Sequence, residues 1–168
     1  MNPPRTTTII KTAVLPANVS VKITATSAPD SLVVSELFLS VQGEGPSTGK
    51  LAIFLRLAGC NRATESKRML FEDIIAELAR LAGKHQPRII ITGGEPLLQQ
   101  DALVAFIDRI KLAKGLRFYP KIEVETNGTI KPSSRLSILV SQWNVSPKLT
   151  HSEDSPTDTI KEDALNYF

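Results

Sequence analysis

The chain of 168 residues contains one cysteine, Cys60, so it cannot form an intrachain disulfide. This fits a reducing compartment, and we expect a cytoplasmic protein. No apolar run approaches the roughly 20 residues that a membrane-spanning helix needs, which argues against a membrane protein. Aromatic residues make up only 5% of the chain, and its 20 basic and 17 acidic residues are interspersed. We therefore predict no direct nucleic-acid partner.

A length of 168 residues is sufficient for one domain with a core, and the hydrophobic fraction of 42% is ordinary for a globular protein. Residues 1–29 contain no acidic residue, and we expect residues 1–17 to be extended or disordered. From Val19 to Thr26, apolar and polar residues alternate, which predicts one appended strand. We therefore divide the chain into a leader of residues 1–31 and a folded domain of residues 32–168.

Apolar periodicity in the folded domain predicts strands that alternate with helices. Strands are predicted at 33–41, 51–57, 89–92, 122–125 and 143–148, and helices at 71–81 and 103–110. Residues 136–140 fit a short helix or a strand, and a further helix is predicted to begin near Ile160. This alternation is typical of right-handed βαβ units, so the predicted fold class is α/β, with a parallel sheet or a partial barrel.

The segment Thr92-Gly93-Gly94-Glu95-Pro96 directly follows the apolar run Ile89–Ile91. Two glycines after a buried strand predict a tight turn whose backbone can come close to a ligand. Its carbonyls and the Glu95 carboxylate could hold the ammonium of an aminoacyl group. The alternative is an ordinary glycine-rich turn, and the motif alone does not distinguish the two.

Polar clusters also follow other predicted strands, at 59–61, 125–128 and 146–148. In parallel α/β folds, ligands bind at the carboxyl ends of the strands. We therefore expect these clusters and the glycine turn to converge on one ligand site.

Five segments, taken in order, resemble one known family. They are Ser40–Pro46, Phe54–Asn61, Thr92–Pro96, Glu125–Gly128 and Ser146–Lys148. From about Val33 to about Lys148 the chain resembles the 7-carboxy-7-deazaguanine synthases, which are radical S-adenosylmethionine (SAM) enzymes of queuosine and 7-deazapurine biosynthesis. The resemblance implies an incomplete (β/α) barrel, truncated in this chain, and a homodimer.

The resemblance also implies a reaction and its cofactors. The family converts 6-carboxy-5,6,7,8-tetrahydropterin to 7-carboxy-7-deazaguanine with loss of ammonia, as a carbon–nitrogen lyase. SAM, a [4Fe–4S] cluster and Mg²⁺ are the implied cofactors, and a reductase is the implied partner.

Two sets of binding residues follow from the resemblance. The set implied at the substrate is Val41, Gln42, Gly43, Glu44, Arg56 and Thr92, and the set implied at SAM is Gly94, Glu95, Ser146, Pro147 and Lys148. Arg56 suits the substrate carboxylate, because a guanidinium can bind a carboxylate through two hydrogen bonds. The alternatives are a structural ion pair for Arg56, a polar turn for residues 42–46, turn caps for Glu125 and Asn127, and a solvated strand end for Lys148.

The chain departs from the family at the iron–sulfur loop, where the family has three cysteines spaced C-x3-C-x2-C. Cys60 matches the first; the other two are absent, as is the Asp-Thr pair implied at magnesium. One thiolate cannot hold a four-iron cluster, so we predict no cluster and no turnover, with Cys60 a small buried side chain. A deletion between Asn61 and Arg62, and loss of the C-terminal part after Phe168, would account for the differences.

Two other functions remain open at this level. The chain could be a non-catalytic module that binds the pterin and SAM, or that pairs with an intact homologue. It could also be related to activating enzymes of glycyl-radical proteins, which share the Gly-Gly-Glu motif, although Gln42–Pro46 argues against that function.

Overall fold

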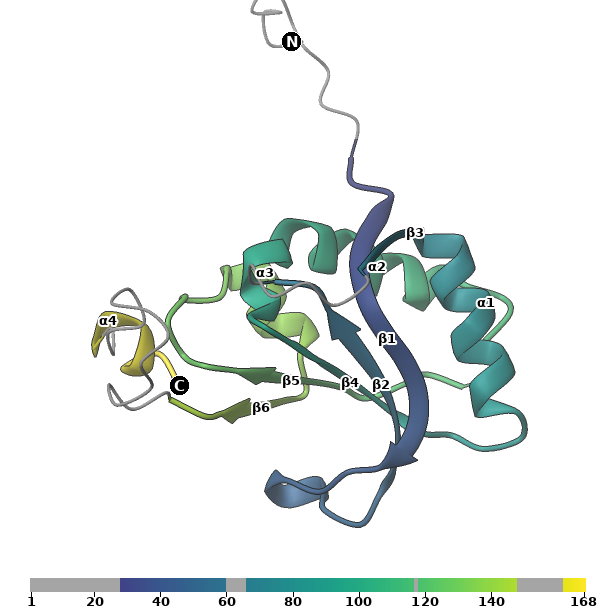
Figure 1. Cartoon of the computed structure of the whole chain (residues 1–168), viewed down its shortest axis with the longest axis horizontal. Coiled ribbons are helices and arrows are strands. Elements are labelled where there is room, and N and C mark those ends of the chain that lie inside the picture. The colour runs from purple at the N-terminus through teal and green to yellow at the C-terminus, as the bar shows by residue number, and fades with distance from the viewer. Residues whose placement is uncertain (1–27, 60–65, 117, 148–161) are drawn as a thin grey trace, which may run out of the picture.

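The structure is a computed structural model that describes residues 28–59, 66–116, 118–147 and 162–168 (Figure 1). The predictions for Cys60, Lys148, the strand at 19–26 and the disordered leader therefore lie outside the described residues. None of the described helices has the length and apolar character that crossing a membrane requires.

A six-stranded sheet forms the centre of the domain, with the strand order β3-β1-β2-β4-β5-β6. The strands are β1 (Ser31–Val41), β2 (Leu51–Leu57), β3 (Lys67–Leu70), β4 (Arg88–Gly93), β5 (Ile122–Thr126) and β6 (Gln142–Val145). The helices are α1 (Phe71–Ala82), α2 (Gln100–Leu112), α3 (Ser134–Leu139) and α4 (Glu162–Leu165), with short 3-10 helices η1 (Gly45–Ser47) and η2 (Pro96–Gln99).

The sheet is mixed. Strands β2, β4, β5 and β6 are parallel, as predicted, whereas β1 pairs antiparallel with both β2 and β3. An antiparallel β1 follows from its short connection to β2, because a parallel neighbour needs a crossover of a dozen or more residues. The expectation of a partial barrel is corrected accordingly: within the described residues the sheet is open, with β3 and β6 at its edges.

One face of the sheet carries the core. Helices α1, α2 and α3 lie on the same side of the strands (Figure 1), and their apolar stripes bury against alternate strand residues. The main members of this cluster are Ile53, Leu55, Leu57, Ile89, Ile91, Val124, Ile74, Leu78, Leu103 and Phe106. The predicted helices and central strands are therefore confirmed, and α1 ends at Ala82, with Gly83 as its C-cap.

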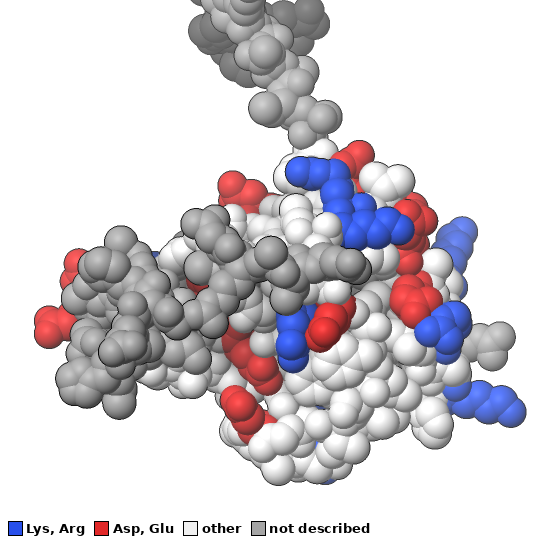
Figure 2. Space-filling model, in the orientation of Figure 1, with Lys and Arg blue, Asp and Glu red and all other residues white. Residues whose placement is uncertain are grey.

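The opposite face, which we call the open face, carries the other alternate residues. From the strand registers these are Glu36, Phe38 and Ser40 on β1, Ala52, Phe54 and Arg56 on β2, Arg88, Ile90 and Thr92 on β4, Glu123 and Glu125 on β5, and Gln142 and Asn144 on β6. The open face is thus rich in polar and charged residues. In the orientation of Figure 2, charged side chains of both signs are interspersed, as the sequence indicated.

Two parts of the fold were not fully predicted. Strand β3 was missed, because Lys67–Leu70 has no clear alternation and becomes a strand by pairing with β1. Leu39 and Val41 belong to the apolar alternation of β1, yet both side chains are exposed.

Candidate ligand site at the strand ends

Four segments meet around a small hollow at the carboxyl ends of β4, β5 and β6. The hollow, which we call the strand-end hollow, has a volume of about 160 Å³ and is lined by Glu44, Thr92, Gly93, Gly94, Glu125, Thr126, Asn127 and Ser146. The β1–β2 connection supplies Glu44. The other lining residues lie at the ends of β4, β5 and β6. Of the segments predicted to converge, Thr92–Gly94, Glu125–Asn127 and Ser146 therefore line one space, whereas Gly59, Gly128 and Pro147 are not among its lining residues.

The glycine turn forms one wall of this hollow by close backbone packing. A Cβ on Gly94 would lie 1.5 Å from the Gly59 carbonyl oxygen, and a Cβ on Gly93, whose φ is 138°, would lie 2.1 Å from that of Leu57. No other residue type fits at these separations. The two glycines thus let the end of β4 lie directly against the segment that follows β2.

The Glu95 carboxylate stabilises the glycine turn through hydrogen bonds. Its buried carboxylate accepts hydrogen bonds from the Leu97 N–H at 2.9 Å, the Thr126 hydroxyl at 2.9 Å and the Asn127 N–H at 2.9 Å. Glu95 is not among the lining residues of the hollow. Its carboxylate therefore joins the end of β4 to the end of β5, and it does not face the space where an ammonium was expected.

Gln42 organises the loop that carries Glu44. Its buried amide donates from Nε2 to Glu125 Oε1 at 3.0 Å and accepts at Oε1 from the N–H groups of Gly43 at 2.8 Å and Glu44 at 3.2 Å. Val41 and Gly43 on either side are exposed. Of the residues implied at the substrate in this segment, Glu44 lines the hollow, and Gln42 holds the backbone of Glu44 in place.

A second anchor holds the same loop at the other end of β5. The Ser47 hydroxyl donates to Glu123 Oε2 at 2.6 Å, and the Arg88 guanidinium lies 2.9 Å from Glu123 Oε1. Glu123 is fully buried. Both anchors are carboxylates of the open face of β5, two residues apart, so this strand fixes the loop that closes one side of the hollow.

Replacing Ser47 with alanine should lower the free energy of unfolding by about 1–3 kcal/mol, because Glu123 Oε2 loses its donor inside the protein. Urea denaturation measures this change. Thr48→Ala is the matched control in the same loop: its exposed hydroxyl donates to the Gly45 carbonyl at 2.7 Å, and its loss should cost less than about 0.5 kcal/mol. Equal losses in the two variants would show that the Ser47–Glu123 bond does not anchor the loop.

Arg56 lies on the open face but not in the hollow. Its guanidinium is 3.3 Å from the Glu36 carboxylate, and both side chains are about half exposed. Arg56 is the register partner of Thr92, which lines the hollow. The structure therefore shows the ion-pair alternative for Arg56, one strand away from the hollow and on the same face.

The remaining predicted residues fall into three groups. Ser146 lines the hollow, with its N–H donating to the Thr126 carbonyl at 2.9 Å, and Pro147 follows it as an exposed residue. Asn127 Oδ1 accepts from the Thr129 N–H at 2.9 Å, so Asn127 caps a turn and also lines the hollow. Cys60 and Lys148 lie outside the described residues.

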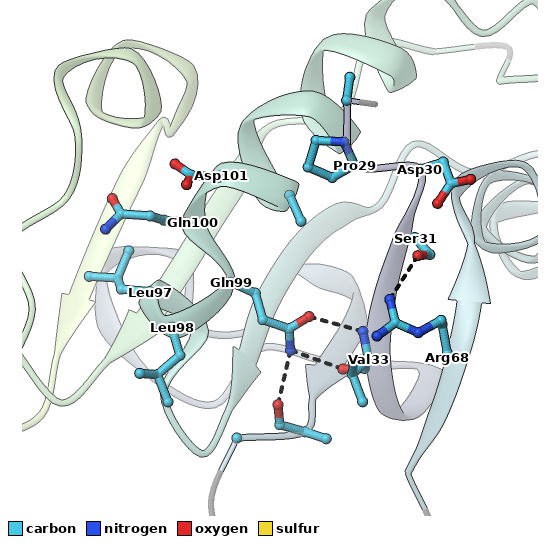
Figure 3. A pocket seen from close by; sticks show the side chains of 14 residues that line it. Pro29, Asp30, Ser31, Val33, Arg68, Leu97, Leu98, Gln99, Gln100 and Asp101 are labelled. Carbon is cyan, nitrogen blue, oxygen red and sulfur yellow. Dashed lines mark hydrogen bonds between the residues drawn. The ribbon is translucent and has the colours of Figure 1, made fainter. Parts of the chain in front are cut away.

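Gln99 is a positioning residue that the sequence did not reveal. Its amide donates to the carbonyls of Val33 at 3.1 Å and Ala58 at 2.9 Å, and accepts from the Val33 N–H at 2.9 Å (Figure 3). It thereby ties η2 to the ends of β1 and β2, beside a cavity of about 690 Å³. Its partners lie 66 and 41 positions away in the chain, so no local pattern indicates this role.

The residues present do not fit a [4Fe–4S] cluster. The whole chain has one cysteine, whereas such clusters are held by several thiolates. Among the described residues no group of three or more His, Cys, Asp or Glu side chains is placed to hold a metal ion. The hollow itself offers two carboxylates, those of Glu44 and Glu125.

Comparison with known proteins supplies the family. No family model matches the chain. It is 33% identical over 159 residues to a 7-carboxy-7-deazaguanine synthase of Rhodopirellula baltica, covering 86% of this chain and 57% of the relative. It is 36% identical over 140 residues to a protein of the same name from Pyrobaculum aerophilum, covering 74% of this chain and 59% of the relative.

The fold is also found in a solved structure. The structure matches the crystal structure of QueE from Escherichia coli with a TM-score of 0.56 and 22% identity, covering 82% of this chain and 67% of that chain. The chain spans a little over half the length of the curated relatives above. By its sequence, this chain belongs to the 7-carboxy-7-deazaguanine synthase family.

Proposed function

We propose that the chain binds the ligands of 7-carboxy-7-deazaguanine synthase at the strand-end hollow and on the adjoining open face. The polar aminoacyl end of SAM would enter the hollow, and the carboxypterin would lie across Thr92 and Arg56. The observation that carries this proposal is that Glu44, Gly94, Glu125 and Ser146, from four separate segments, line one space.

The size and chemistry of the hollow support a partial fit to SAM. At about 160 Å³ it is smaller than the roughly 300–1,000 Å³ that usually encloses a small molecule. It therefore suits one end of a ligand, with the remainder lying on the open face. Glu44 and Glu125 would attract an ammonium group, and the Ser146 hydroxyl and the Asn127 amide would serve a carboxylate.

We further propose that this chain, acting alone, does not catalyse the radical reaction of the intact family. The proposal rests on its single cysteine. Cleavage of SAM to a radical is the chemistry that the cluster supplies when it is bound. The residues described here would hold and orient the ligands, and no chemical step is assigned to them.

Anaerobic reconstitution with iron and sulfide tests the lack of activity. We expect less than one tenth of a [4Fe–4S] cluster per chain and no release of 5′-deoxyadenosine after reduction, because one thiolate is too few ligands. The measurement is iron and acid-labile sulfide per chain, with absorption near the usual iron–sulfur bands. A stoichiometric cluster together with deoxyadenosine release would contradict the proposal and restore the ordinary enzyme function.

The resemblance further supports a homodimer, a cytoplasmic location and, in the intact family, magnesium and a reductase. Sedimentation of the purified chain tests the dimer directly. A monomer at concentrations well above micromolar would dismiss it.

A further inference from the structure

Glu36 and Arg56 form an accessible ion pair beside the proposed pterin position. They are register partners in the antiparallel β1–β2 pair and lie on the open face of the sheet. Their side chains remain 55% and 49% exposed, and the guanidinium contacts Glu36 Oε2 at 3.3 Å. A ligand arriving from solvent can therefore reach both partners.

The arginine is held toward β1. The Arg56 guanidinium lies over the Phe38 ring, 6.0 Å from its centroid, and Phe38 stacks on Phe54 with centroids 5.3 Å apart and an interplanar angle of 8°. Ring contact and ion pairing act together, because both Glu36 and Phe38 belong to β1. Thr92 and the strand-end hollow lie on the other side of Arg56, toward β4.

We propose that Glu36 is a specificity-determining counter-ion for the ligand carboxylate at Arg56. In the free protein the Glu36 carboxylate pairs with the Arg56 guanidinium. A ligand carboxylate takes the place of Glu36 in this ion pair. This inference rests on the proposed function, which puts the pterin carboxylate at Arg56. Glu36 belongs to no recognised motif. Its charge opposes the binding of anions that contact the protein only through Arg56.

The electrostatics give the direction of the effect. An exposed ion pair contributes about 0–1 kcal/mol, so a ligand with additional contacts can replace it. A ligand carboxylate at Arg56 would then lie roughly 5 Å from Glu36, where two like charges repel by about 1–3 kcal/mol for effective dielectric constants between 80 and 20. Removing the Glu36 charge should therefore strengthen binding of a carboxylate ligand and leave a neutral ligand unaffected.

Glu36→Gln tests the inference, since glutamine keeps the shape and removes the charge. The probes are 6-carboxypterin and pterin without the carboxylate, titrated at low ionic strength and followed by pterin fluorescence. We expect Glu36→Gln to bind 6-carboxypterin about three- to tenfold more tightly than the wild type. Pterin should bind equally to both proteins. Arg56→Gln should abolish the preference for the carboxylated ligand.

Glu77→Gln is the matched control, because it removes a surface carboxylate that pairs with Arg80 on α1, on the helix side of the sheet. It should bind both pterins as the wild type does. Equal affinities of wild type and Glu36→Gln for 6-carboxypterin would overturn the role of Glu36 while leaving the proposed function intact. No binding of either pterin to any of these proteins would overturn the proposed function and this inference with it.

Discussion

Replacing Gly94 with alanine is expected to lower the free energy of unfolding by at least about 3 kcal/mol, above the usual range for an overpacked side chain. The new Cβ would lie 1.5 Å from the Gly59 carbonyl oxygen and 2.4 Å from its carbon. Both obstacles are backbone atoms, so no side-chain rotation relieves the contact. The end of β4 must move away from the segment after β2, and the wall of the hollow moves with it.

Urea denaturation of Gly94→Ala against Gly43→Ala measures this effect. Gly43 lies in the β1–β2 connection, and a Cβ there would meet nothing within 4 Å. Gly43→Ala should therefore change the free energy of unfolding by no more than about 0.5 kcal/mol. If Gly94→Ala is as stable as Gly43→Ala, the close packing of the glycine turn against Gly59 is wrong.

Replacing Arg88 with methionine should lower the free energy of unfolding by about 3–5 kcal/mol, the usual cost of leaving a buried charge without its partner. Glu123 is fully buried, and Arg88 is the cation beside it at 2.9 Å. Methionine retains most of the apolar stem of arginine, so lost packing contributes little. The same substitution should also loosen the loop that Ser47 anchors on Glu123.

Two further variants test whether the unpaired charge of Glu123 causes the loss of stability in Arg88→Met. Arg80→Met removes an arginine whose side chain is 68% exposed and pairs with Glu77 on the surface of α1, and it should leave the free energy of unfolding nearly unchanged. The double variant Arg88→Met/Glu123→Gln removes the orphaned charge and should recover most of the lost stability. A double variant no more stable than Arg88→Met would show that the buried charge is not the cause.

Much of the fold follows from local pattern. Ile53, Ile89 and Val124 lie in apolar or alternating runs, and the helices α1 and α2 have clear apolar stripes. The parallel pairing of β2, β4 and β5 follows from the helices that connect them. The antiparallel β1 and the edge strand β3 depend on tertiary pairing, which periodicity does not encode.

The position of the strand-end hollow could be predicted from the sequence, but the hydrogen bonds around it could not. Ends of parallel strands meet at one edge of a sheet, so the glycine turn, Glu125 and Ser146 could be expected together. The direction of the Glu95 carboxylate, toward Thr126 and Asn127, is set by a strand 31 positions further along the chain. The Ser47–Glu123 bond joins residues 76 positions apart and has no signature in the sequence.

The strand-end hollow as the ligand site is most directly tested by calorimetric titration of SAM into the wild-type chain and into two serine variants. Ser146→Leu would fill the hollow, whereas Ser141→Leu places the same side chain at an exposed position before the opposite end of β6. Saturable binding to the wild type and to Ser141→Leu, weakened at least tenfold in Ser146→Leu, is the predicted result. Absence of binding to the wild type, or equal binding to all three proteins, would contradict this assignment.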